Sequence, residues 1–182
     1  MVSPFLMTKY SCTAFIGIGA NLPGLNFLTP RATCIAAIQE LLSYGMSIEN
    51  QSSWYKSAPV PTSAQPWFIN GIISVKTSLK APDLIGILQN IEKKFGRVRT
   101  TKNAARTLDL DLIDYANTVL GWGKKNDSDL IIPHPRMHKR SFVLLPLFEI
   151  APNWHHPVLK MSIEELIKKL DSNQQILLDN EG

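Results

Sequence analysis

The chain has 182 residues, 45% of them hydrophobic, which is enough to bury the core of one domain. Lys and Arg number 19 against 15 Asp and Glu, and this formal charge of +4 falls short of the basic stripe of duplex-binding proteins. No apolar run approaches the ~20 residues that span a bilayer. Composition thus argues against nucleic-acid and membrane partners, whereas a small cationic surplus suits a small anionic ligand.

The two cysteines, Cys12 and Cys34, form no CxxC pair and have no His at ligand spacing, so neither a disulfide framework nor a zinc site is expected. No signal peptide is recognisable, and we expect a cytoplasmic protein with no evident protein partner. One domain is expected over residues 13–170, with 1–12 and 171–182 as terminal extensions. Met7 is a second candidate start, and the polar tail from residue 171 is expected to fray.

The first expected elements are a strand, a helix and two further strands. Residues 13–19 are short and apolar and run into a loop, as a buried strand would. Thr29 and the proline after it form the expected start of a helix that ends at Gly45. Residues 46–55 and 68–77 both have an extended pattern, and we expect them to pair as neighbouring strands.

A second helix is expected to begin at Pro82 and to end at Gly96, because its apolar residues recur at helical spacing from Leu84 to Phe95. Residues 107–115 then alternate between apolar and polar side chains, as a strand does. The resulting order, β-α-β-β-α-β, predicts a ferredoxin-like α+β sandwich. Its helices would cover one sheet face and leave the other free to build a site.

Extra helical elements are expected toward the C-terminus. Residues 136–145 favour a helix that stops before Pro146. Ser162 and Glu165 form a capping-box pattern, which opens an amphipathic helix expected to reach Leu170.

Asp109 and Asp111 are the most informative pair in the chain. Strand side chains alternate, so both carboxylates project from one face while the leucines between them bury the other. At ~4 Å and an effective dielectric near 20 the two charges repel by about 4 kcal/mol. Mg²⁺ relieves such repulsion, and it takes one or two carboxylates together with substrate phosphates. The alternative is a plain hydrophilic strand face, because D-x-D alone is a weak motif.

A basic cluster directly precedes the acidic pair and favours the phosphate interpretation. It consists of Arg97, Arg99, Lys102 and Arg106. Guanidinium groups match phosphate oxygens with paired hydrogen bonds. A solvated basic turn is the alternative for the cluster taken alone.

The segment 133–142 is a second candidate for anion contacts, because it contains His134, Arg136, His138 and Arg140. The two histidines are four residues apart, but no third ligand or neighbouring glutamate accompanies them, so zinc chemistry is not indicated. Phosphate contact is the favoured interpretation of the segment. A basic surface helix start is the alternative.

Several common motifs are missing. Gly17 and Gly19 lack the third glycine of a dinucleotide-binding turn, and no GxxxxGK[ST] or GxSxG occurs.

Asn70 lies among apolar strand residues, where an unpaired amide is costly. It either satisfies neighbouring backbone or reads the edge of a flat heterocycle between aromatic rings such as Phe68 and Phe142. The residues alone leave both options open.

Six stretches together resemble the 6-hydroxymethyl-7,8-dihydropterin pyrophosphokinase family of folate biosynthesis. The stretches are Ile-Gly-Ile-Gly-Ala-Asn-Leu (16–22), Ser-Trp-Tyr-Lys-Ser-Ala-Pro-Val (53–60), Gln-Pro-Trp-Phe-Ile-Asn (65–70), Gly-Arg-Val-Arg (96–99), Arg-Thr-Leu-Asp-Leu-Asp (106–111) and Pro-His-Pro-Arg-Met-His-Lys-Arg-Ser-Phe (133–142). The similarity runs from about Phe15 to Pro152. It implies a ferredoxin-like fold and transfer of pyrophosphate from the co-substrate ATP to the pterin hydroxymethyl group, with release of AMP.

The resemblance also implies residue roles. By this similarity Asp109 and Asp111 bind two Mg²⁺ ions, and Arg97 and Arg106 are catalytic and contact the triphosphate together with His134. The remaining implied contacts are Gln89 and Glu92 for the nucleotide, and Ser57, Val60, Phe68, Asn70, Arg140 and Phe142 for the pterin. Phe142 is expected to stack on the ring and Asn70 to hydrogen-bond its edge.

One stretch departs from the family pattern. Many members carry Trp-Gly-Pro before the arginine that matches Arg106, in a loop that closes over the substrates, whereas this chain has Asn103-Ala104-Ala105. An aromatic lid contact is therefore missing.

Two rival functions share the predicted element order: a polymerase-like or cyclase-like nucleotidyl transferase, which attacks the α-phosphorus, and a small-molecule sensor without catalysis.

Overall fold

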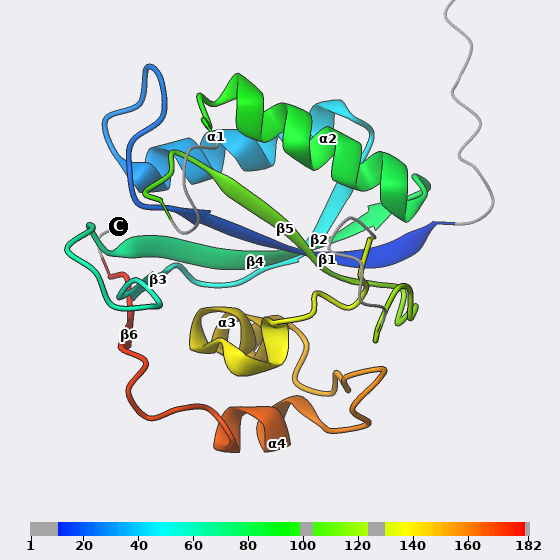
Figure 1. The fold of residues 1–182 in the computed structure, drawn as a ribbon. Coiled ribbons are helices and arrows are strands. Elements are labelled where there is room, and N and C mark those ends of the chain that lie inside the picture. The colour runs from blue at the N-terminus through cyan, green and yellow to red at the C-terminus, as the bar shows by residue number, and fades with distance from the viewer. Residues whose placement is uncertain (1–10, 99–103, 124–129, 181–182) are drawn as a thin grey trace, which may run out of the picture.

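The computed structural model describes residues 11–98, 104–123 and 130–180. Six strands form one antiparallel sheet, with α1 and α2 on one face and α3 and α4 on the other (Figure 1). The strands are β1 Cys12–Ala20, β2 Ser47–Gln51, β3 Tyr55–Ser57, β4 Phe68–Thr77, β5 Asp109–Tyr115 and β6 Ile176–Leu178. The helices are α1 Pro30–Ser43, α2 Ala81–Lys94, the 3-10 turn η1 Met137–Lys139, α3 Ser141–Ile150 and α4 Ile163–Lys168.

The sheet has the order β5-β1-β4-β3-β6, and β2 also pairs with β4. The expected pairing of residues 46–55 with 68–77 is confirmed, because Ser47 lies opposite Lys76 and Tyr55 opposite Asn70. β1 is central and pairs antiparallel with both β4 and β5. Three long strands, with β5 at the sheet edge, are thus held in fixed register.

The two helices expected from the first half of the chain are confirmed. Thr29 caps α1 by accepting a hydrogen bond from the Ala32 N–H. Gly45 and Gly96, which end the two helical segments, have φ angles of +80° and +83°, a conformation that glycine adopts without steric cost. The apolar stripe of α2 packs with α1 against β1 and β4 in the larger core.

The opposite sheet face is not free, contrary to expectation. Ile72 of β4 and Ile113 of β5 project from it and pack in a second core with Val143 and Leu147 of α3 and Leu166 of α4. Apolar side chains on that face must be buried, and the C-terminal helices do so. The molecule therefore has three layers, and a site can occupy only the part of this face that α3 leaves open.

The C-terminal half corrects three further expectations. A helix over 136–145 is wrong, since η1 ends at Lys139 and α3 begins at Ser141 and continues through Pro146. Burial of the α3 face offsets the backbone hydrogen bond that proline removes. The capping box of α4 is confirmed, but this helix ends at Lys168. The segment after residue 171 is not frayed, because β6 pairs with β3.

A cluster of aromatic rings holds η1 against the segment between α3 and α4. His156 is fully buried, and its ring contacts Trp122, His138 and Trp154 with centroid distances of 5.2, 5.7 and 5.7 Å. Its Nδ1 accepts the N–H groups of residues 158 and 159. Burial, followed by repulsion from His138, lowers the pKa of His156 to about 4.

The buried histidine predicts acid sensitivity. The unfolded chain binds a proton on this group near pH 6.5 but the folded chain only near pH 4, so its contribution to stability is complete above about pH 6.5 and declines toward pH 4. An Asn in place of His156 keeps an acceptor for both N–H groups without titrating. We expect His156→Asn to reduce the difference in unfolding free energy between about pH 7.5 and pH 5 by about 2 kcal/mol.

Urea unfolding at the two pH values measures this difference. His155→Asn, which changes the exposed neighbouring histidine, is the control. An equal pH dependence in wild type and His156→Asn would contradict the prediction.

Candidate functional site

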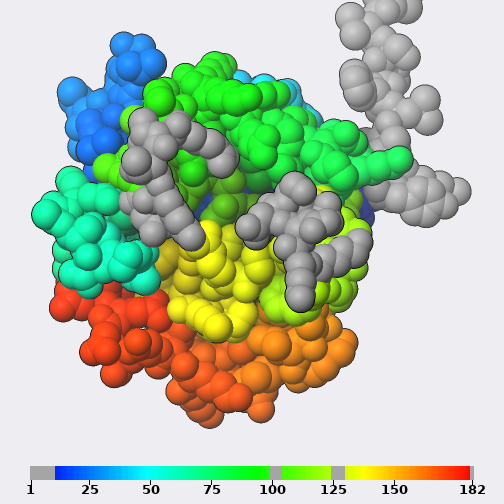
Figure 2. All heavy atoms as spheres, in the orientation of Figure 1, coloured from blue at the N-terminus to red at the C-terminus, as the bar shows by residue number. Residues whose placement is uncertain are grey.

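A cavity of about 330 Å³ lies on the α3 side of the sheet, between α2, β5 and the start of α3. Figure 2 shows this face hollowed between the atoms of α2 and those of the 130–150 segment. All of the residues to which the family resemblance assigns a role line the cavity: Ser57, Val60, Phe68, Asn70, Gln89, Glu92, Arg97, Arg106, Asp109, Asp111, His134, Arg140 and Phe142. The structure thus brings together residues spread over 86 positions of the chain.

Asp109 and Asp111 project from the same face of β5, as strand alternation predicts. Asp109 lies opposite Gly19 of β1, and Gly19 lies opposite Asn70 of β4, so the three positions form one row across the sheet. A Cβ atom at position 19 would lie 3.2 Å from Asn70 Oδ1. Glycine therefore keeps the cavity floor open between the carboxylates and the amide.

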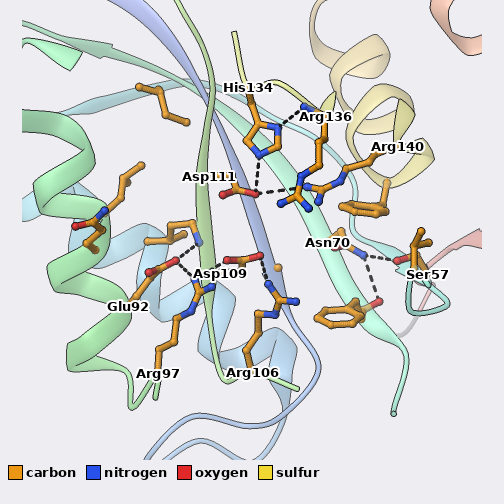
Figure 3. A pocket seen from close by; sticks show the side chains of 18 of the residues that line it. Ser57, Asn70, Glu92, Arg97, Arg106, Asp109, Asp111, His134, Arg136 and Arg140 are labelled. Atoms are coloured by element: carbon orange, nitrogen blue, oxygen red, sulfur yellow. Dashed lines mark hydrogen bonds and ion pairs between the residues drawn. The ribbon is translucent and has the colours of Figure 1, made fainter. Parts of the chain in front are cut away.

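Two arginines flank Asp109 (Figure 3). Arg97 binds Oδ1 of Asp109, and Arg106 binds Oδ2 at 2.7 Å. The Arg97 guanidinium also pairs with buried Glu92 of α2. Glu92 Oε1 in turn accepts the N–H of Leu110 at 2.8 Å, so one side chain ties α2 to both β5 and Arg97. The result is a chain of alternating charges along the cavity wall.

Asp111 has more distant partners than Asp109. His134 Nε2 and Arg140 NH1 each lie 3.8 Å from its Oδ2. Burial and repulsion from Asp109 raise the pKa of Asp111 to about 6, although Arg140 opposes the shift. The acidic pair is therefore only partly compensated by protein charges.

The segment 133–142 reaches the cavity through three of its four candidates. The His134 N–H donates to the Ile113 carbonyl at 2.8 Å, which anchors the segment to β5. Burial and then Arg140 lower the pKa of His134 to about 4. Its Nδ1 accepts the Arg136 N–H, so at neutral pH its Nε2 carries the proton and faces Asp111. His138 does not line the cavity and belongs to the aromatic cluster.

The opposite end of the cavity is flatter and more apolar. Asn70 donates from Nδ2 to the Ser57 hydroxyl at 2.9 Å. Phe68 lies under the Arg106 guanidinium and Phe142 under that of Arg140, at 5.3 and 5.4 Å from the ring centroids. One amide edge and two aromatic rings therefore surround this end, while Val60 lies at its rim and is half exposed. Such a space fits a flat, polar-edged ring.

Some functional positions were not identified from the sequence. Asn21 accepts the N–H of Arg106 on its Oδ1, and its own N–H donates to the Arg106 carbonyl, so it fixes the Arg106 backbone just before β5. Gly19 and Ile131 line the cavity. The run that contains Gly19 and Asn21 was a usable signal, because an Asn directly after a buried strand needs partners. Arg99, Lys102 and Asn103 lie outside the described residues.

Comparison with known proteins identifies relatives of the chain. The model of the family described as 7,8-dihydro-6-hydroxymethylpterin-pyrophosphokinase matches residues 15–152. A 2-amino-4-hydroxy-6-hydroxymethyldihydropteridine pyrophosphokinase of Synechocystis is 42% identical over 172 residues, which cover 93% of this chain and 82% of the relative. The protein of the same name from Haemophilus influenzae is 36% identical over 92% of this chain and 98% of the relative.

Among solved structures, wild-type HPPK-DHPS of Plasmodium falciparum matches 88% of the chain with a TM-score of 0.63 and 14% identity, a likeness that shows the fold alone. This chain spans 45% of that longer protein. It likewise covers 20% of the folic acid synthesis protein fol1 of Pneumocystis carinii, at 36% identity.

The geometry of Glu92 predicts a structural role for it. Glu92→Gln removes the charge that pairs with Arg97 in a buried place, and we expect the unfolding free energy to fall by about 1–3 kcal/mol. Urea unfolding measures the change. Gln89→Ala, on the exposed side of the same helix, is the control, and equal stability of the two variants would contradict the assignment.

Proposed function

The chain belongs to the 7,8-dihydro-6-hydroxymethylpterin-pyrophosphokinase family, and we propose that the cavity between α2, β5 and α3 is its active site. The enzyme transfers pyrophosphate from ATP to 6-hydroxymethyl-7,8-dihydropterin, a step of folate biosynthesis, and forms the pterin diphosphate and AMP. One observation carries the proposal. A partly compensated acidic pair, surrounded by arginines, lies beside a flat aromatic pocket in the same cavity.

The residues at the acidic end fit a magnesium site. Asp109 and Asp111 offer the hard oxygen donors that Mg²⁺ prefers. Burial and then repulsion from Asp109 raise the pKa of Asp111, and a bound cation would favour the charged form of both carboxylates. The described residues contain no group of three or more His, Cys, Asp or Glu able to hold a metal. This suits Mg²⁺, which takes its other ligands from phosphates and water. We propose two ions here, which when bound neutralise charge on the phosphates of ATP.

The nucleotide end is proposed to involve Gln89, Glu92, Arg97, Arg106 and His134. Arg97 and Arg106 already face one another across Asp109, so a triphosphate entering between them would meet two guanidinium groups at once. His134 is neutral at pH 7 and offers its Nε2 proton as a hydrogen-bond donor. Glu92 would act by holding Arg97 in place. Gln89 is exposed on α2 at the cavity wall, within reach of the nucleoside.

The pterin end is proposed to involve Ser57, Val60, Phe68, Asn70, Arg140 and Phe142. Phe142 would stack on the ring and the Asn70 amide would pair with its polar edge, held in orientation by Ser57. With the ring placed in this way, the hydroxymethyl group would lie on the side of the proposed phosphate site. Its oxygen would attack the β-phosphorus in line, while the bond from the β-phosphorus to the oxygen that bridges it to the α-phosphorus breaks and AMP leaves. The two arginines would position the phosphates and compensate their charge.

Three finer points belong to the same proposal. The order β5-β1-β4-β2 together with α1 and α2 supports a ferredoxin-like core to which α3, α4 and β6 are added. No helix among the described residues is long and apolar enough to cross a membrane. Because ATP is the co-substrate, we place the enzyme in the cytoplasm, acting on small molecules without a nucleic-acid or protein partner.

Replacement of either metal-site carboxylate is expected to abolish turnover. Asp109→Ala or Asp111→Ala removes an oxygen ligand and several kcal/mol of charge stabilisation, which corresponds to a loss of at least ~10³-fold in kcat. The assay mixes enzyme, ATP, Mg²⁺ and hydroxymethyl-dihydropterin and measures AMP. Asp83→Ala on the exposed start of α2 is the control. Near-normal AMP formation would refute the metal assignment, and release of pyrophosphate instead of AMP would favour a nucleotidyl transferase.

The aromatic wall of the pterin pocket predicts a selective effect on one substrate. Phe142→Ala removes the stacking surface, and we expect KM for the pterin to rise about tenfold while KM for ATP stays within about twofold. Steady-state kinetics with each substrate varied in turn measure both constants. Phe148→Ala in the same helix, which does not line the cavity, controls for lost stability. Equal rises for both substrates would argue against the stacking role.

A further inference from the structure

Two consecutive residues near the C-terminus contact both walls of the proposed pterin pocket. Gln174 forms hydrogen bonds at the start of α3, where Arg140 directly precedes the helix and Phe142 lies in its first turn. The Gln175 carbonyl accepts the N–H of Ala58, next to Ser57. The match to the family model ends at residue 152, so this segment lies beyond it. No role in the site follows from the sequence motifs for either glutamine.

The Gln174 side chain bonds the backbone on either side of Arg140. Its Oε1 accepts the N–H of Ser141 at 2.9 Å, and its Nε2 donates to the carbonyl of Lys139 at 3.0 Å. Ser141 is the first residue of α3, and N–H groups in a first helical turn have no partner within the helix. Arg140 does not cap α3 with its own side chain. Gln174 supplies this missing acceptor from 33 residues away.

The neighbouring backbone braces the other wall. β3 has only three residues, and β6 pairs with it along its length, with Ser57 opposite Ile176. At the far end of β6, buried Asp179 pairs with Lys56 at 3.1 Å and with Arg31 at 3.4 Å, and its N–H donates to the Trp54 carbonyl. The Ser57 hydroxyl that orients Asn70 therefore stands on a strand held from both sides.

Gln174 itself is held by a tight turn. Its N–H donates to the Asp171 carbonyl at 3.2 Å, and the Asp171 carboxylate accepts the N–H of Asn173 at 2.9 Å. Because the turn fixes the Gln174 backbone, only the side-chain torsions remain to be ordered, and the two side-chain hydrogen bonds link this turn to residues 139 and 141.

From these contacts we infer that Gln174 is a positioning residue for pterin binding. It fixes the backbone of residues 139–141, and through it the orientation of Arg140 and Phe142 relative to Ser57 and Asn70. The inference rests on the proposed function, because it assigns the pterin to this end of the cavity. A change at Gln174 should act mainly on the pterin, since the contacts of Arg97 with Glu92 and Asp109 lie at the opposite end of the cavity.

The kinetic test compares Gln174→Ala with Gln175→Ala. Both remove the same side chain, but Gln175 contributes its backbone carbonyl, which the substitution keeps. We expect Gln174→Ala to raise KM for the pterin about tenfold, with KM for ATP within about twofold, whereas Gln175→Ala behaves as wild type. Gln174→Glu keeps the acceptor for Ser141 but not the donor to Lys139, and it is expected to restore part of the affinity. An unchanged pterin KM in Gln174→Ala, or equal rises for both substrates, would overturn the inference.

Amide hydrogen exchange in the ligand-free protein tests the link without turnover. Exchange of the Ser141 N–H should become at least about tenfold faster in Gln174→Ala and stay unchanged in Gln175→Ala. Unaltered Ser141 exchange in Gln174→Ala would overturn the link even if the enzyme is active. Failure of the wild type to form AMP would instead refute the proposed function and leave the exchange result to decide the link by itself.

Discussion

Repulsion between Asp109 and Asp111 is the constraint on which the site depends. Both carboxylates project from one face of β5, because the two residues are two positions apart in the same strand. The two carboxylates form ion pairs with arginines from different parts of the chain. Asp109 pairs with Arg97 and Arg106, and Asp111 with Arg140. The compensation is uneven, because Asp111 has only distant partners and a raised pKa. Residual negative charge at Asp111, with guanidinium groups nearby, suits the magnesium and triphosphate that are proposed to bind here.

The register of the sheet strands places the acidic pair at one end of a cavity whose other end has a different chemical character. Asp109, Gly19 and Asn70 form one row across β5, β1 and β4, and glycine in the middle position leaves space above the strand. Charged groups gather on the β5 side of that row and aromatic rings on the β4 side. The proposed substrate pair, one a polyanion and the other a flat ring, fits such a division.

The C-terminal third of the chain completes the site in two ways. α3 and α4 bury the apolar part of the sheet face, so that only the polar end of this face stays open. The segment after α4 then returns to the sheet as β6 and ties β3 to the start of α3. The residues after 171 look like a plain polar tail in the sequence. In the structure their main chain pairs with β3, and the Gln174 amide makes two hydrogen bonds beside α3, so this segment borders the pocket.

Local patterns in the sequence were enough to determine β1, α1, β4, α2 and β5, since apolar periodicity, caps and terminal glycines act over a few residues. The same alternation placed Asp109 and Asp111 on one face, and the motifs identified the family. Only the tertiary structure decided that α3 continues through Pro146, that the second sheet face is covered, and that Glu92 and Asn21 hold the arginines. These outcomes depend on contacts between residues far apart in the chain, and a short window of sequence does not show which distant residues will meet.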